Sequence, residues 1–263
     1  MDGKQHNETD PFTHAIVRPP GATFSDGITS ADLGRPDLAL ARVQHQGYVG
    51  ALERCGLQVT VLDPDDRYPD ATFVEDTAVM TREWAVVTRP GALPRRGETA
   101  AVGDELARRF PALFAMEPPG TLDGGDVMAA GARYFIGLSG RTNADGAAQL
   151  TRFLGDRGCS AVTIALKSLL HLKTGVSWLG GDTLLVAAEL ADCEAFAGFR
   201  KIVVDPAEAY AANCIRVNDH VILPGGHSHT KSALEAAGYP VIPVDVSEFR
   251  KMDGGVSCLS LRF

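Results

Sequence analysis

Short β-branched runs alternate with longer amphipathic stretches along most of the chain. Strands are predicted where the β-branched runs stand, at 15–18, 57–62, 85–87, 162–166 and 202–204. Helices are predicted where apolar residues recur at helical spacing, at 37–55, 99–110 and 143–155. This alternation of the two element types indicates an α/β or α+β protein.

A pair of short strands joined by a tight turn recurs along the chain, and residues with polar chemistry open each copy. The copies begin at Phe73, Asp123, Gly175 and Ala212, and a truncated copy begins at Asp253. Openings about forty to fifty residues apart are typical of propellers and other repeat arrays. Five such units suggest a closed ring, with polar openings such as 75–76 and Asp126 converging on its axis. Chance similarity among glycine-rich hairpins explains the pattern about equally well.

Length and composition narrow the class of protein. The 263 residues are 45% hydrophobic and 22% charged, which fits one large or two small globular domains and excludes wholesale disorder. The net charge is −8, and no basic run interrupts the acidic background. This balance argues against nucleic acid and anionic membrane surfaces as partners, and favours a cationic small molecule. No apolar stretch approaches the roughly eighteen residues of a membrane helix.

The cysteines indicate a cellular compartment, and one of them is a candidate nucleophile. There are five, with no C-x-x-C spacing and no secretion-like segment before them, so we expect reduced thiols in the cytoplasm. Cys258 follows two glycines in DGGVSCLSL, where the backbone can approach a ligand closely, and is a candidate nucleophile. The alternative is a buried structural thiol, which suits the other four cysteines.

A nucleophilic cysteine needs a base or a cationic neighbour, and histidine is the usual one. His171 stands in the partly apolar segment LLHLKTG, where an ionisable ring needs a function or a buried partner. His227 and His229 form an H-x-H pair that offers a weak metal signal. No cysteine or carboxylate stands nearby at ligand spacing, so a solvated loop is the favoured interpretation.

Carboxylates and arginines complete the set of candidate residues. Glu75 and Asp76 interrupt a strand-like run, and as strand neighbours they would face opposite sides, so at least one would point inward. An inward carboxylate predicts either an internal salt bridge or a pocket for a guanidinium or ammonium group. Arg95 and Arg141 follow strands and are candidates to bind a carboxylate, although surface arginines are common.

These segments together resemble the dimethylarginine dimethylaminohydrolases, members of the guanidino-group-modifying superfamily with the pentein fold. The resemblance runs from about His14 to Phe263. It rests, in order and at family spacing, on FVEDTAV, TRPGALPRRGE, LDGGDV, GLSGRTNADGA, LLHLKTG, YAANCIRVN and DGGVSCLSLRF. The related arginine deiminases have a long helical insertion that is missing here, and usually an acidic residue at the position of Lys173.

The resemblance implies an α/β fold, a five-bladed pentein of ββαβ repeats around a central active-site channel. A flexible lead-in over 1–12 and a single catalytic domain over 13–263 are expected. The implied reaction converts dimethyl- or monomethylarginine to citrulline and an alkylamine through a covalent cysteine intermediate. Cys258 would be the nucleophile, His171 the general acid that later activates water, and Asp123 the residue that orients His171.

The resemblance also implies the binding residues. Carboxylates around the guanidinium would come from Asp70, Glu75 and Asp76. The substrate α-carboxylate would be held by Arg95 and Arg141. The α-amino group would be held by the backbone carbonyls of Ile28 and Met252.

No cofactor or metal is required by this chemistry, and the expected partner is the small-molecule substrate, with no nucleic acid and no membrane. A homodimer is left open. Two alternatives stay open as well. One is a deiminase that releases ammonia from unmethylated arginine, and the other is a binding protein for arginine derivatives without catalysis.

Overall fold

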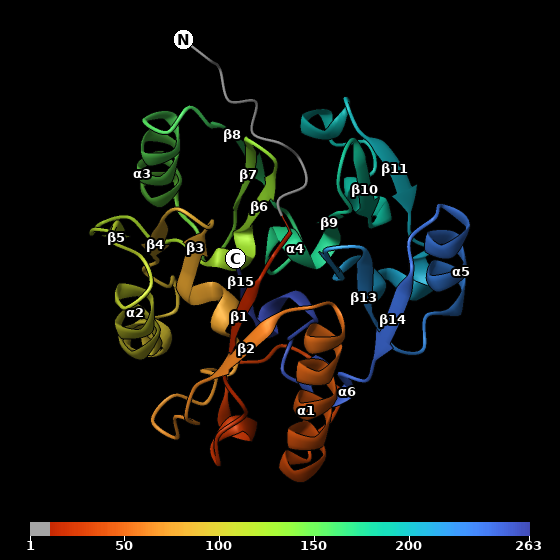
Figure 1. The fold of residues 1–263 in the computed structure, drawn as a ribbon, viewed down its shortest axis with the longest axis horizontal. Helices are drawn as coiled ribbons and strands as arrows, with labels where there is room; N and C mark the ends of the chain where they lie inside the picture. The colour runs from red at the N-terminus through yellow and green to blue at the C-terminus, as the bar shows by residue number, and fades with distance from the viewer. Residues whose placement is uncertain (1–10) are drawn as a thin grey trace.

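The computed structural model describes residues 11–263, which form five three-stranded sheets arranged in a ring (Figure 1). In each sheet the central strand pairs antiparallel with one neighbour and parallel with the other. Each sheet is one blade, and the prediction of a five-bladed α/β ring is confirmed. Most of the predicted lead-in, residues 1–10, lies outside the described residues.

The first blade combines both ends of the described chain. Its members are β15 (Leu261–Arg262), β1 (His14–Val17), α1 (Leu38–Arg54) and β2 (Gln58–Val61). Ala15 pairs with Arg262, and the N–H groups of Thr13 and His14 donate to the Phe263 carbonyl at 2.9 and 2.8 Å. The truncated repeat is therefore completed by the first strand, which closes the ring.

The other four blades follow in chain order. The second contains β3 (Ala78–Met80), β4 (Ala85–Val87), α2 (Thr99–Ala107) and β5 (Leu113–Ala115). The third contains β6 (Val127–Ala130), β7 (Arg133–Leu138), α3 (Ala144–Gly155) and β8 (Ser160–Ala165). The fourth contains β9 (Val176–Trp178), β10 (Thr183–Val186), the 3-10 turns η5 (Ala188–Leu190) and η6 (Glu194–Phe196), and β11 (Arg200–Val203). The fifth contains β12 (Ile215–Val217), β13 (His220–Pro224), α5 (Ser228–Ala236) and β14 (Val241–Val244).

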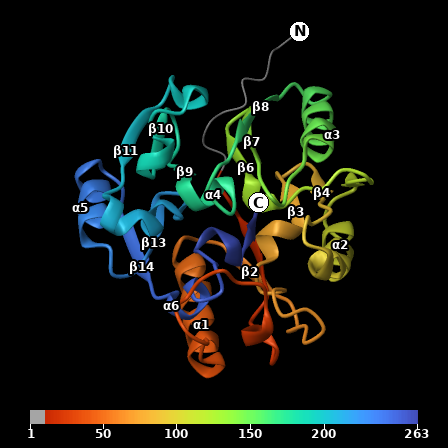
Figure 2. The same ribbon diagram turned by 180° about the vertical axis from the view of Figure 1, so that it is seen from behind.

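The helices α1, α2, α3 and α5 lie on the outside of the ring in both views (Figures 1 and 2). α1 begins after Asp37, whose carboxylate accepts the N–H groups of Ala39 and Leu40, and the chain turns away at Gly56 with a φ of +89°. α3 begins after Asn143, whose side chain accepts the N–H of Gly146. Both helices match their predicted ranges because these caps are local to the sequence.

Apolar clusters fill the seams between neighbouring blades. Trp84 of the second blade packs with Tyr134 and Leu150 of the third, and Ile16 of the first packs with Leu106 of the second. The ring is held together by burial of these side chains, each of which stabilises the fold by roughly 1.5–3 kcal/mol. None of the helices within residues 11–263 is both long enough and apolar enough to cross a membrane.

A short helical turn precedes the first strand of every blade. These turns are η2 (Val74–Thr77), η4 (Gly124–Asp126), α4 (Leu172–Gly175), η7 (Pro206–Ala212) and η8 (Ser257–Leu259). They contact one another at the centre of the ring. The contact between η2 and η4 is tight, since a Cβ at Gly124 would lie 2.0 Å from the carbonyl oxygen of Glu75.

The predicted strand geometry of Glu75 and Asp76 is wrong. Both residues lie on the turn η2, and both are buried rather than facing opposite sides of a sheet. The turn forms because the chain must bend from the ring axis into β3, which the alternation of residue types does not encode.

Candidate active site

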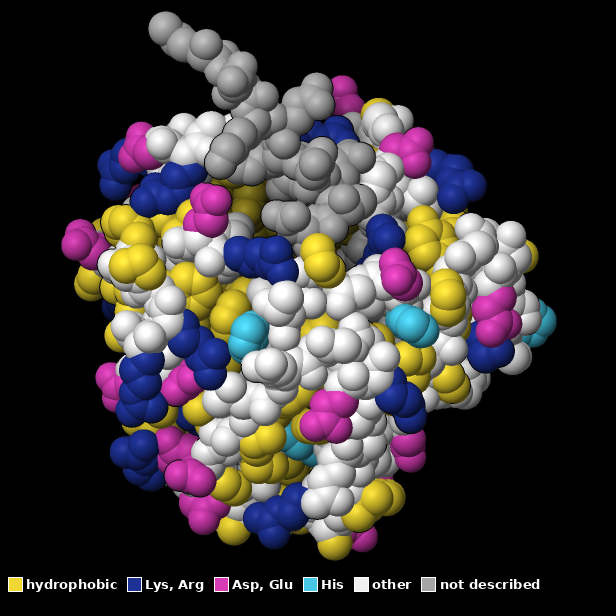
Figure 3. Space-filling model, viewed as in Figure 1, with side chains coloured by type: hydrophobic (Ala, Val, Ile, Leu, Met, Phe, Trp, Pro, Cys, Tyr) yellow, Lys and Arg dark blue, Asp and Glu magenta, His cyan; other side chains and the backbone are white. Residues whose placement is uncertain are grey.

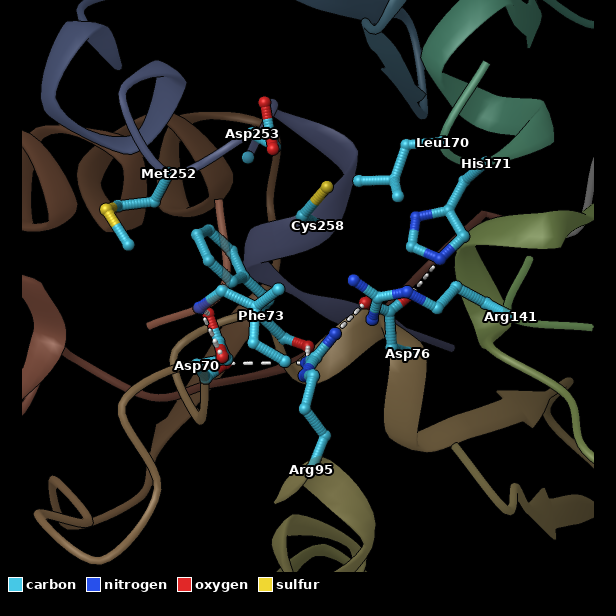
Figure 4. Close-up of a pocket in the computed structure, with 12 residues that line it drawn as sticks. Asp70, Phe73, Asp76, Arg95, Arg141, Leu170, His171, Met252, Asp253 and Cys258 are labelled. Carbon is cyan, nitrogen blue, oxygen red and sulfur yellow. Dashed lines mark hydrogen bonds and ion pairs between the residues drawn. The ribbon is translucent and has the colours of Figure 1, made fainter. Parts of the chain in front are cut away.

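A pocket opens at the centre of the ring, where the five turns meet. It is lined by Ile28, Asp70, Phe73, Asp76, Arg95, Arg141, Leu170, His171, Met252, Asp253, Gly254 and Cys258 (Figure 4). Most of the predicted site residues are therefore brought together from loops far apart in the sequence. Charged side chains of both signs are intermixed on the face of the molecule in Figure 3.

Cys258 lies on η8, and its sulfur points into the pocket toward the wall formed by Leu170 and His171 (Figure 4). The Gly255 N–H donates to Sγ at 3.3 Å, and the Ser257 N–H donates to the Asn213 side chain at 2.9 Å. Burial, followed by the negative charges of Glu75 and Asp76, raises the pKa of the thiol. Without a bound cation, Cys258 is therefore a thiol at neutral pH.

His171 precedes α4, and its ring reaches back toward η4 and η2. Its Nε2 lies 3.0 Å from Asp123 Oδ2 and 3.9 Å from Asp76 Oδ1. Burial lowers the pKa of His171, but the charge of Asp76 and the hydrogen bond to Asp123 outweigh it and raise the pKa to about 9. The ring is therefore protonated at neutral pH and donates from Nε2 to Asp123.

Asp123 is fully buried and held on every side. Its Oδ1 accepts the Gly91 N–H at 2.9 Å, and its own N–H donates to the Thr142 hydroxyl at 3.1 Å. With Oδ2 facing His171, the carboxylate has no freedom to turn away. This geometry suits the predicted role of orienting the histidine.

Asp76 lies between His171 and the arginine on the opposite wall. Its Oδ1 accepts the Gly125 N–H at 2.9 Å, and its Oδ2 accepts from Arg95 Nη1 at 2.6 Å. Burial alone would raise the pKa of Asp76, but the charges of His171 and Arg95 hold it below its usual range. Asp76 is therefore ionised and aimed at the pocket.

The two predicted arginines have different surroundings. Arg95 lines the pocket, yet its guanidinium also donates to Glu98 at 2.8 Å and to the Phe73 carbonyl at 3.2 Å. Arg141 is held less tightly, since its guanidinium makes a longer ionic contact, from Nη1 to Asp123 Oδ2 at 3.8 Å. Arg141 is thus the better placed of the two to bind an added carboxylate.

The opposite end of the pocket is formed by Asp70, Ile28 and Met252. The Ile28 N–H donates to both carboxylate oxygens of Asp70, at 3.2 and 3.1 Å. Burial raises the pKa of Asp70 despite the nearby charge of Arg95. A Cβ at Gly27 would lie 2.4 Å from Asp70 Oδ1, so the loop can approach Asp70 this closely because Gly27 has no side chain.

Glu75 differs from its predicted position, because it does not line the pocket. Its Oε1 accepts from Lys173 Nζ at 2.7 Å and from Arg262 Nη2 at 3.1 Å. The side chain lies behind the pocket wall, between η2 and the last strand of the chain. The contact of Glu75 with the guanidinium stays a prediction, and its carboxylate is paired here with Lys173 and Arg262.

Several residues that shape the site were absent from the prediction. Glu98 shares Arg95 with Asp76, and burial raises its pKa to about 7 although Arg95 acts in the opposite direction. Asn213 holds the Cys258 turn, and it stands in the YAANC segment, to which no role was assigned. Asp253 accepts from the Ser30 N–H at 2.6 Å and so connects the 27–30 loop to the segment that carries Cys258.

One group of side chains has the spacing of a cation site. Within residues 11–263, Asp76, Asp123 and His171 place ligand atoms within 4.8 Å of one another. The hydrogen bond between His171 and Asp123 accounts for this closeness without an ion. His227 and His229 do not belong to that group, and His227 Nδ1 instead lies 2.8 Å from the Gly225 carbonyl.

The chain is similar in sequence to known proteins. The chain is 46% identical over 253 residues to the N(G),N(G)-dimethylarginine dimethylaminohydrolase of Pseudomonas aeruginosa, covering 96% of this chain and 100% of the relative. It is 35% identical to the enzyme of that name from Streptomyces coelicolor, over 96% of this chain and 97% of the relative. No protein-family model matches the chain.

Solved structures agree with the sequence relatives. A cysteine-to-serine variant of the Pseudomonas aeruginosa enzyme complexed with citrulline superimposes with a TM-score of 0.95 at 45% identity, covering 96% of this chain and 100% of that chain. The N-terminal domain of the cyanobacterial arginine dihydrolase ArgZ shares the fold, with a TM-score of 0.86 at 22% identity, over 96% of this chain and 97% of that domain.

Five three-stranded blades closed around a polar pocket define the class: the protein is an α/β propeller of the pentein fold. Within that class, the identity of 46% over 96% of its length shows that the chain belongs to the dimethylarginine dimethylaminohydrolase family.

Proposed function

We propose that the protein hydrolyses Nω,Nω-dimethyl-L-arginine to L-citrulline and dimethylamine, and the monomethyl compound to citrulline and methylamine. The observation that carries the proposal is the central pocket, which is lined by a half-buried thiol, a protonated histidine and an ionised carboxylate. The citrulline complex of the Pseudomonas aeruginosa relative supports the same product.

The substrate is expected to bind with its guanidinium beside Asp76, between Cys258 and His171. Charge-assisted hydrogen bonds to a carboxylate fix a planar cation in orientation as well as position. At the other end, the carbonyls of Ile28 and Met252 would receive the α-amino group. Asp70, which was predicted beside the guanidinium, lies against Ile28 and would instead join them. Arg141, with Arg95 behind it, would bind the α-carboxylate.

The bound cation activates the nucleophile. Because burial and two nearby carboxylates raise the pKa of Cys258, a guanidinium bound beside Asp76 lowers this pKa again and releases the thiol proton to solvent. The thiolate then attacks the guanidinium carbon. Protonated His171 donates its proton to the departing dimethylamine, and the carbon–nitrogen bond breaks to leave a cationic thiouronium bound to Cys258.

The second half of the reaction uses the same residues in reverse. Neutral His171 accepts a proton from water, and the hydroxyl adds to the thiouronium carbon. The carbon–sulfur bond then breaks, Cys258 leaves as a thiolate, the hydroxyl proton passes to solvent, and citrulline is released. Asp123 holds His171 in place through both proton transfers, and Asp76 stabilises the positive charge of the adducts.

The test is product formation by the purified protein. Equal amounts of citrulline and dimethylamine from dimethylarginine are expected, and Cys258→Ser should abolish both. Cys193→Ser, which removes a half-buried thiol outside the pocket, is the matched control and should leave the rate unchanged. Ammonia release from arginine at the higher kcat/KM would instead assign a deiminase, and binding without any turnover would assign a binding protein.

We infer that the protein acts in the cytoplasm on the free amino acid. All five cysteines are unpaired, which accords with a reducing compartment. A homodimer stays a prediction, for which light scattering of the purified protein is the direct measurement.

A further inference from the structure

Lys173 stands two residues after His171, on the same short turn α4. Its Nζ lies 2.7 Å from Glu75 Oε1, on the turn η2 that also carries Asp76. Only 17% of the lysine side chain and 4% of the glutamate side chain are exposed. The ion pair is therefore partly shielded from water and connects the turn of the histidine to the turn of the aspartate.

The Glu75 carboxylate is unevenly paired. Both Lys173 and Arg262 donate to Oε1, whereas Oε2 is buried and has no hydrogen-bond partner among the described residues. A buried anion with one free oxygen exerts a field on its neighbours, because little water is present to screen it. The turn η2 contacts η8, so the field acts on Cys258.

We propose that Lys173 is a positioning residue of the reaction, one that offsets the charge of Glu75 beside Cys258 and ties the His171 turn to the Asp76 turn. This inference rests on the proposed function. Lys173 does not line the pocket and has no contact with the reacting atoms, so it acts through Glu75.

Other charges also act on the thiol and must be held constant in a test. The groups that surround it are Glu75 and Asp76 of η2, His171 and Lys173 at α4, Tyr210 of η7, Arg262 of β15, and Asp70, Arg95, Arg141 and Asp253 of the pocket wall. Arg262 keeps Glu75 partly paired when Lys173 is removed, so the Lys173 variant leaves no fully isolated charge. We therefore expect removal of Lys173 to have a moderate effect on the reactivity of Cys258.

Three variants separate charge from packing. Lys173→Met removes the ammonium but keeps most of the apolar stem, Lys173→Arg keeps the charge, and Lys173→Met with Glu75→Gln removes both members of the pair. Lys231→Met is the matched control, since Lys231 makes an equally short ion pair to Glu235 at 2.7 Å on the exposed surface of α5. Thermal unfolding of each variant shows whether it is folded.

Two readouts are measured across pH: alkylation of Cys258 by iodoacetamide without substrate, located by peptide mapping, and kcat/KM for dimethylarginine. Lys173→Met should slow alkylation at neutral pH about three- to tenfold, which is a rise of roughly half to one unit in the thiol pKa. The kcat/KM should fall by a similar factor. Lys173→Arg and the double variant should recover most of the alkylation rate, and Lys231→Met should match the parent protein.

An unchanged alkylation rate in Lys173→Met, or a double variant no faster than Lys173→Met, would overturn the proposal, because a purely structural lysine is not rescued by removing Glu75. The alkylation arm needs no turnover. If the parent protein fails to release citrulline, the proposed function fails on its own, and the alkylation rates still decide whether Lys173 controls Cys258.

Discussion

Arg95 Nη1 lies 2.6 Å from Asp76 Oδ2, and only 5% and 4% of the two side chains are exposed. Glu98 binds the same guanidinium from the other side at 2.8 Å. Arg95 therefore holds the Asp76 carboxylate in place at the edge of the pocket. A residue predicted for substrate binding is at the same time part of the framework of the site.

Removing Arg95 should destabilise the protein strongly. Arg95→Ala leaves the two carboxylates of Asp76 and Glu98 buried without their cation, and breaking a buried pair in this way costs about 3–5 kcal/mol. Urea unfolding of the parent protein and of Arg95→Ala measures the difference in their free energies of unfolding. Arg108→Ala is the control, because that side chain is 75% exposed in its pair with Glu105 and its loss should change stability by about 0.5 kcal/mol or less. Equal losses in both variants would contradict the buried network.

The pH profile should report the Asp123–His171 pair. His171 must be protonated to donate to the leaving amine, so kcat/KM of the parent protein should fall as pH rises through about 9, the raised pKa of His171. Asp123→Asn removes the hydrogen-bonded charge and should move this alkaline limb toward the ordinary histidine pKa of about 6.5, with a lower maximum. Asp104→Asn, at an exposed position on α2, should leave the limb in place.

The same pair should contribute to stability in a defined pH window. The pKa of His171 is higher in the folded protein than in the unfolded chain, so its stabilisation is fully present below about pH 6.5 and is lost as pH rises through about 9. Unfolding experiments at several pH values should show this loss in the parent protein and a smaller one in Asp123→Asn. A profile of the same shape in both proteins would argue against the assignment.

Arg141 should control recognition of the substrate carboxylate. Arg141→Met is expected to raise KM for dimethylarginine by roughly 30-fold or more, since loss of one partner of a charge pair in a binding site costs about 2–5 kcal/mol. Dimethylagmatine, which lacks the carboxylate, should be turned over with nearly the same kcat/KM by the variant and the parent protein. Steady-state kinetics with both substrates gives the comparison, and Arg54→Met, at the exposed end of α1, is the control. An equal loss of kcat/KM with both substrates would indicate instead that Arg141 acts by positioning Asp123.

The ring could be predicted from the recurring hairpins only together with the family resemblance, since periodicity alone leaves chance similarity equally possible. The central grouping of Cys258, His171 and Asp123 was implied by the resemblance. Each hairpin carries its polar opening in a local stretch of sequence, and a closed ring places every such opening at the axis. The helix limits at Asp37 and Asn143 were predictable for a similar reason, since a capping side chain acts within three residues.

The ion pairs could not be predicted in the same way. Glu75 with Lys173 joins residues 98 positions apart, and Glu75 with Arg262 joins residues 187 apart, so both depend on how separate blades pack. The turn at η2 was missed because its sequence has the β-branched character of a strand. The shape of η2 is set by its contact with η4, which is so close that position 124 has no room for a side chain.

Two glycine substitutions test that packing with opposite expected signs. Gly124→Ala would place a Cβ 2.0 Å from the Glu75 carbonyl oxygen and 2.8 Å from that of Ala78, so backbone must move. Such overpacking costs about 1–3 kcal/mol. Because the displaced turn carries Asp76, turnover should fall as well. Gly47 lies on the exposed face of α1, and a Cβ there would meet no atom of residues 11–263 within 4 Å.

Gly47→Ala should therefore stabilise the protein by about 0.5–1 kcal/mol, through the lower conformational entropy of alanine in the unfolded chain, and leave kcat/KM unchanged. Thermal unfolding and steady-state kinetics of both variants give the stability and the turnover of each. If Gly124→Ala lost stability but kept its turnover, η2 would be able to shift while Asp76 keeps its place. The hydrogen bonds of Asp76 to Arg95 and Gly125 would then be what holds the carboxylate. Loss of both, with Gly47→Ala more stable and fully active, would show that the turn contact at the ring axis fixes the carboxylate on which the chemistry depends.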